Sequence, residues 1–90
     1  MTTKDIDLTL RFLEAATNLD LSRLDKENLV KIWTVTTIPG GDIIHHNNPL
    51  FFPAESLGRP VRVIFFWKDG STSAEDAWVE HCTLPTALVP

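Results

Sequence analysis

The spacing of apolar residues changes along the chain, and each change marks a different expected element. Between residues 4 and 18, Ile6, Leu10 and Leu13 recur at helical intervals, and their neighbours are strong helix formers. Apolar residues also alternate as far as Phe12, as they would in a strand. We expect a helix in this segment, with a strand as the alternative.

A hairpin is predicted near the middle of the chain. Residues 29–38 end in a β-branched run typical of strands, although their first half, as far as Trp33, is also compatible with a helix. The sequence PGGD at residues 39–42 is a strong turn signal, and apolar residues then begin a returning strand. This second strand is expected to end near His45 and His46.

The clearest strand pattern covers residues 61–67. Alternation would give this strand two faces, with Val61, Val63, Phe65 and Trp67 on one side and Arg62, Ile64 and Phe66 on the other. Both faces are largely apolar, so the strand is expected to be central in its sheet or covered on both sides.

A second helix is predicted after the turn at Asp69 and Gly70. Ser73 is a suitable N-cap, acidic residues fill the first turn, and His81 would lie in the last turn. Helical spacing gives this segment one face, made of Ala74, Ala77, Trp78 and His81. Pro85 would end the helix, and the apolar tail at residues 86–90 would pack on the core or form an edge strand.

These elements predict a single α+β domain over residues 1–90. The expected architecture is an N-terminal helix, a small, mostly antiparallel sheet of three to four strands, and a C-terminal helix packed on the sheet. A chain of 90 residues buries only a modest core, which leaves little volume for a deep, enclosed active site.

Charge and composition limit the expected partners. The formal charge is −4, and the eight Lys and Arg residues are dispersed. Because phosphate contacts dominate nucleic-acid affinity, we expect no nucleic-acid partner. The longest apolar run, residues 63–67, is far too short to span a membrane. Cys82 is the only cysteine, which excludes an internal disulfide and favours a cytoplasmic location.

The histidines are the first candidates for metal or acid–base chemistry. Adjacent residues of a strand point to opposite faces, so His45 and His46 cannot both join one site, and no ligand pair has the spacing typical of zinc sites. His81 and Cys82 would lie about 100° apart on a helix, which is poor geometry for a thiol–imidazole pair. We therefore predict no metal, no cofactor and no catalytic residue.

The aromatic residues are more informative. Leu50, Phe51 and Phe52 lie between two prolines, in a segment expected to be a loop. Apolar loop residues either cover the core or face a partner. A second exposed surface is expected on the central strand, because a small chain can cover only one face of its sheet. Its residues would be Arg62, Ile64 and Phe66.

These features predict a small, acidic, non-catalytic protein-interaction or regulatory module. The partner would be another protein or a second copy of the chain. In the second case the protein would be a homodimer. Two surfaces would bind the partner, with Trp33 or Trp67 nearby. Their residues would be Leu50, Phe51 and Phe52 in the loop, and Arg62, Ile64 and Phe66 on the central strand. On this prediction, Phe52→Ala would weaken partner binding more than it lowers the melting temperature.

The alternative function is small-molecule binding, or a modest enzymatic activity, in a cone-like α+β fold whose helices close over a curved sheet. Its pocket would be lined by aromatic and imidazole side chains, namely Trp33, Trp67, Trp78, His45 and His81. The shortness of the chain counts against such a pocket.

Overall fold

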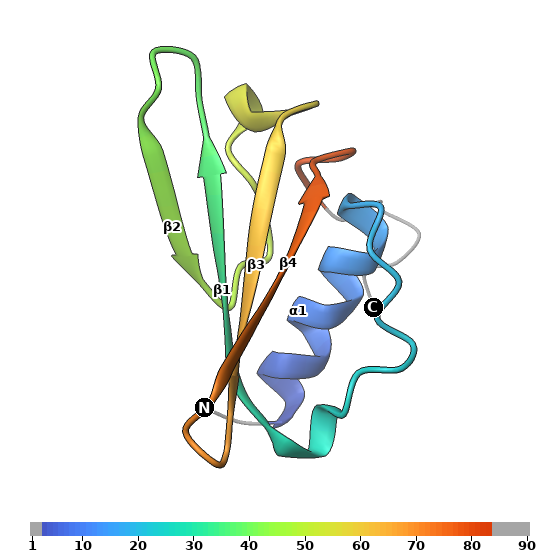
Figure 1. Ribbon diagram of the computed structural model, residues 1–90. Coiled ribbons are helices and arrows are strands. Elements are labelled where there is room, and N and C mark those ends of the chain that lie inside the picture. Colours follow the sequence, from blue (N-terminus) through green and yellow to red (C-terminus); the bar gives the residue numbers. More distant parts are fainter. Residues whose placement is uncertain (1–2, 84–90) are drawn as a thin grey trace.

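The computed structural model describes residues 3–83 as one helix followed by four strands (Figure 1). The helix is α1 (Thr3–Ala16), and the strands are β1 (Leu29–Thr37), β2 (Ile43–Asn47), β3 (Pro60–Trp67) and β4 (Thr72–Trp78). Short 3₁₀ turns, η1 (Lys26–Asn28) and η2 (Ala54–Ser56), lie in the connections. The strands form one antiparallel sheet in the order β2-β1-β3-β4.

The predicted N-terminal helix is confirmed as α1. Its buried side chains include Ile6, Leu10 and Leu13, which fall at the helical spacing noted in the sequence, and Ala16 continues the same stripe. Figure 1 shows α1 on one side of the sheet, so this apolar stripe faces the strands. The alternative interpretation of this segment as a strand is wrong.

The predicted hairpin of β1 and β2 is also confirmed. In its turn the Ile38 N–H donates to the Asp42 carbonyl at 3.1 Å, and the Gly41 N–H donates to the Ile38 carbonyl at 3.1 Å. Gly40 and Gly41 have φ angles of 98° and 89°. Most side chains avoid this region of backbone conformation, which explains the Gly-Gly pair.

The two predicted faces of β3 are observed. Val61, Val63 and Phe65 are buried, and they alternate with residues that are exposed or half-buried. β3 lies between β1 and β4, so it is a central strand. Because α1 lies on only one side of the sheet, the strand's two apolar faces have different environments.

The predicted C-terminal helix is wrong. The segment with helical spacing forms β4, which pairs with β3 along its whole length. The turn between them is tight, since the Trp67 N–H donates to the Ser71 carbonyl at 3.0 Å. β4 is therefore held by backbone hydrogen bonds to an apolar strand, and this tertiary pairing overrides the weak local preference for a helix. Pro85 and residues 86–90 lie outside the described residues.

The core lies between α1 and one face of the sheet, which we call the inner face. The connection after β2 also contributes to it through Phe52. The buried apolar residues are Ile6, Leu10, Phe12, Leu13, Ala16, Leu21, Leu29, Ile32, Phe52, Val61, Val63, Phe65, Ala77 and Val79. Within residues 3–83, no helix combines the length and the apolar character needed to cross a membrane. With four paired strands and one helix, the described part of the chain is mostly β.

Candidate functional site

The opposite face of the sheet, which we call the outer face, is not covered by any described helix or strand. Residues paired across antiparallel strands point to the same side, so strand register identifies its members. They are Lys31, Trp33, Val35 and Thr37 on β1, Ile43, His45 and Asn47 on β2, Pro60, Arg62, Ile64 and Phe66 on β3, and Thr72, Ala74, Asp76 and Trp78 on β4.

An aromatic cluster lies at one end of this outer face, across β1 and β3. The rings of Trp33 and Phe66 meet edge to face, with centroids 4.6 Å apart. The Lys31 Nζ lies 5.0 Å from the Trp33 ring centroid and 4.7 Å from that of Phe66. Both distances are within the range of cation–π attraction. The cluster therefore combines apolar area with a fixed positive charge.

An ion pair crosses the same face from β3 to β4. Arg62 Nε lies 2.8 Å from Asp76 Oδ1, and Arg62 Nη2 lies 3.2 Å from Asp76 Oδ2. The two residues are register partners, so the guanidinium meets the carboxylate with two parallel hydrogen bonds. The hydrogen bond from Arg62 lowers the pKa of the Asp76 carboxyl and raises that of Arg62. The pair neutralises both charges.

A shallow hollow adjoins the aromatic cluster at the β2 edge. Its volume is about 390 Å³, and its lining residues are Lys31, Trp33, His45, His46 and Asn47. This volume is within the range of sites that take a small ligand or a single side chain. The hollow thus extends the outer face beside the Lys31 ammonium.

The loop predicted as a partner-binding surface divides between surface and core. Leu50 and Phe51 are 47% and 51% exposed, whereas Phe52 is only 2% exposed. The Phe52 ring packs on Phe12 with centroids 4.8 Å apart. Phe52 is therefore a core residue. Leu50 and Phe51 remain exposed, and the Phe51 ring contacts His46 at 5.1 Å between centroids.

The histidines do not converge. His45 pairs with Val35 and belongs to the outer face, whereas His46 pairs with the buried Thr34 on the inner side. The adjacent histidines therefore point to opposite faces, as the strand geometry predicted. His81 is exposed beyond the end of β4. In the described part of the chain, no three His, Cys, Asp or Glu side chains are close enough to hold a metal ion.

The tryptophans of the alternative pocket are also separated. Trp33 and Trp78 lie on the outer face, where β1 and β4 are not neighbours. Trp67 belongs to the inner side, where its Nε1–H donates to the Ser73 hydroxyl at 2.9 Å. The structure thus brings together only Trp33 and His45 from the set that sequence analysis proposed as a pocket.

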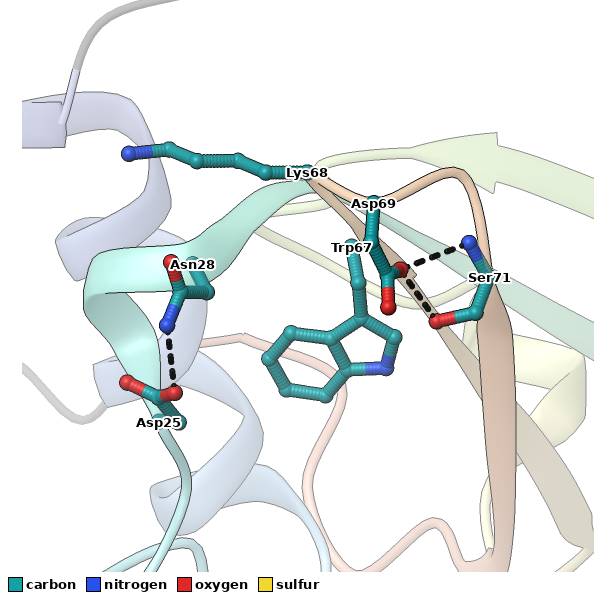
Figure 2. Close-up of a pocket in the computed structure, with 6 residues that line it drawn as sticks. All are labelled: Asp25, Asn28, Trp67, Lys68, Asp69 and Ser71. Atoms are coloured by element: carbon teal, nitrogen blue, oxygen red, sulfur yellow. Dashed lines mark hydrogen bonds between the residues drawn. The ribbon is translucent and has the colours of Figure 1, made fainter.

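Trp67 instead forms the floor of a separate pocket, shown in Figure 2, between η1 and the β3–β4 turn. Its volume is about 730 Å³, and its walls are polar, formed by Asp25, Asn28, Lys68, Asp69 and Ser71. The Asn28 amide donates to the Asp25 carboxylate at 2.6 Å, and hydrogen bonds from Ser71 lower the pKa of Asp69. These contacts stabilise the two turns, which accounts for the polar walls without a ligand.

Sequence analysis missed Lys31 and Asp76. Their partners became visible only with the strand register, because Lys31 meets Phe66 across β1 and β3 and Asp76 meets Arg62 across β3 and β4. One signal was present in the sequence, since Lys31 and Trp33 are two residues apart on a predicted strand and must share a face.

Comparison of the chain with models of protein families, with curated proteins and with solved structures found no match.

Proposed function

We propose that this protein is a non-catalytic interaction module that binds another protein through its outer face. The observation that carries the proposal is that α1 and the core cover only one face of the four-stranded sheet (Figure 1). The inner face is covered, whereas the outer face presents Trp33 at 37%, Trp78 at 54% and Ile43 at 59% exposure. Large apolar side chains exposed on one face of a sheet, beside polar residues, are typical of surfaces that contact another protein.

The composition of the outer face also supports a protein partner. Aromatic residues and arginine dominate the binding energy at interfaces, and Trp33, Phe66 and Arg62 are close to one another on the central strands. The rings are held by their mutual contact and by Lys31, so little side-chain freedom is lost on binding. A preorganised cluster of this type suits recognition of another chain.

The size of the outer face favours a transient contact. The strands contain nine, five, eight and seven residues. At about 3.3 Å per residue and about 4.8 Å between strands, they outline roughly 450 Å². Standard interfaces bury about 800 Å² of accessible surface on each partner. Protruding side chains add accessible area and narrow this difference. The outline of the face is nevertheless smaller than a standard interface, so we expect a regulatory contact that forms and dissociates.

The charges on the outer face favour a different protein over a second copy. The face has two cations, Lys31 and Arg62, and one anion, Asp76. In a symmetric dimer the same face would supply both sides, so four cations would meet two anions. Burying positive charge without a matching counter-charge costs free energy, which disfavours the symmetric dimer. The proposal includes a cytoplasmic location, which is supported by a single, free cysteine.

The test compares two outer-face variants, Trp33→Thr and Phe66→Thr, with a control, Leu57→Thr. Leu57 is 57% exposed in the connection after β2, outside the outer face, so its substitution removes apolar area elsewhere. Threonine preserves strand preference at the two test positions. Wild type and each variant are immobilised, and the proteins that each retains from a cell extract are quantified. Proteins retained by wild type are then purified, and their binding to wild type and to each variant is measured by calorimetric titration.

We expect a partner that binds wild type and Leu57→Thr equally but binds each outer-face variant at least about tenfold more weakly. Circular dichroism must show that all variants are folded. Equal binding by all four proteins would refute the proposal. Sedimentation equilibrium provides a second check, because dimerisation abolished by Trp33→Thr would identify a second copy as the partner and refute the preference for a different protein.

A further inference from the structure

We infer that the partner presents a carboxylate flanked by apolar residues, and that Lys31 is the residue that selects it. This inference rests on the proposed function and specifies the chemistry of the partner. It follows from the environment of one ammonium group on the outer face.

The Lys31 ammonium is positioned but not neutralised. Its Nζ lies within 5.0 Å of two ring centroids, and its side chain is half-buried. Among the described residues, the only ion pair joins Arg62 to Asp76. An ammonium has three donors, and aromatic rings accept no strong hydrogen bond from them. In the free protein, water satisfies these donors.

Binding of a partner would remove this water. If the partner were purely apolar, the ammonium would be buried without a counter-charge, which is strongly unfavourable. A carboxylate would replace the water with a short, charge-assisted hydrogen bond. A basic partner would be repelled. Lys31 therefore discriminates among partners that fit the same apolar surface.

Arg62 does not have the same role, because both of its contacts reach the Asp76 carboxylate. Within residues 3–83, the outer face thus has one cation with an acidic partner, Arg62, and one without, Lys31. Lys31 lies beside the hollow of about 390 Å³, where Asn47 provides an exposed amide. A partner can therefore place an apolar side chain in the hollow while its carboxylate reaches Lys31.

The test uses selection from a phage-displayed library of random peptides, because this probe does not assume the partner's sequence. The targets are wild type, Lys31→Met, Trp33→Thr and Lys68→Met. Methionine keeps the length of the lysine stem and packs well on aromatic rings, so the fold of Lys31→Met is preserved. Lys68 is exposed on the β3–β4 turn outside the outer face, so Lys68→Met gives the same change of net charge elsewhere.

We expect wild type and Lys68→Met to select peptides that combine Asp or Glu with aromatic or aliphatic neighbours. Lys31→Met should still select apolar residues but lose the acidic preference. For a synthetic peptide from the wild-type selection, replacing its acidic residue by the corresponding amide should weaken binding to wild type about tenfold and leave binding to Lys31→Met unchanged.

The outcomes separate this inference from the proposed function. Apolar selection that depends on Trp33 but shows no acidic preference, or an acidic preference that persists in Lys31→Met, would overturn the inference and leave the proposed function intact. Peptides whose binding is the same for wild type and Trp33→Thr would count against both.

Discussion

The burial of Phe52 beside an exposed Phe51 gives a direct test of the structure. The two rings are neighbours in sequence, yet Phe52 is 2% exposed and Phe51 is 51% exposed. Truncating a buried Phe to Ala costs about 3–5 kcal/mol. A chain of this size has a total stability of about 5–13 kcal/mol. At the lower end of this range Phe52→Ala would leave too little stability for a clean measurement, so we choose leucine.

Phe52→Leu should lower the free energy of unfolding by about 1–2 kcal/mol. The estimate lies between the cost of a volume-conserving swap and that of truncation to Ala, because leucine fills part of the space against Phe12. Phe51→Leu is the matched control, and it should cost less than about 0.5 kcal/mol because the side chain is at the surface.

Urea denaturation followed by circular dichroism measures both changes. With a slope of about 1–1.5 kcal/mol/M, Phe52→Leu should move the midpoint down by roughly 1 M. Similar midpoints for Phe51→Leu and Phe52→Leu would refute the structural placement of Phe52. This result would instead favour the expectation from the sequence that Phe52 serves binding more than stability.

Three further predictions concern single polar groups. Thr34 is fully buried and its hydroxyl has no hydrogen-bond partner among the described residues, so Thr34→Val should stabilise the protein by about 1 kcal/mol in urea denaturation. Asn48 accepts a hydrogen bond from the Ile32 N–H at 2.8 Å and has a φ of 49°. Asn48→Ala should therefore destabilise the protein more than Asn48→Gly, because alanine loses the hydrogen bond and also tolerates this φ poorly; equal losses would contradict the strain argument. The pKa of Asp76 is lowered chiefly by its hydrogen bond from Arg62, so NMR titration should show it rising in Arg62→Ala. The stability from this pair is present above the carboxyl's unfolded pKa and is lost as pH falls through its lower folded pKa, a loss that Arg62→Ala should abolish.

The sequence was sufficient where a pattern depends on local geometry. The helical spacing of Ile6, Leu10 and Leu13 identified α1, and the alternation in β3 identified both faces of the central strand. The Gly-Gly turn placed the first hairpin correctly, because only a few residue types adopt its backbone angles. These features are determined within a few residues of one another.

The sequence was insufficient where the outcome depends on distant partners. The helical face predicted around Ala74 and Trp78 is also compatible with a strand, and pairing with β3 decided the outcome. Composition could not separate Phe51 from Phe52, since only the packing of the loop on Phe12 makes one of them core. The position of Lys31 over Phe66 likewise depends on a register shift between β1 and β3.

The outer face has properties that neither a core nor an ordinary surface needs. A core layer would bury Trp33 and Ile64 under a second element, and the described chain has no helix or strand left for that role. An ordinary surface would have no need to order two aromatic rings beneath an ammonium. The Arg62–Asp76 pair shows that this sheet can neutralise a cation across neighbouring strands. No acidic side chain among the described residues pairs with Lys31, so water solvates its ammonium in the free protein and the partner supplies the counter-charge in the complex. The apolar residues of the outer face therefore provide contact area, and Lys31 favours partners that present a carboxylate.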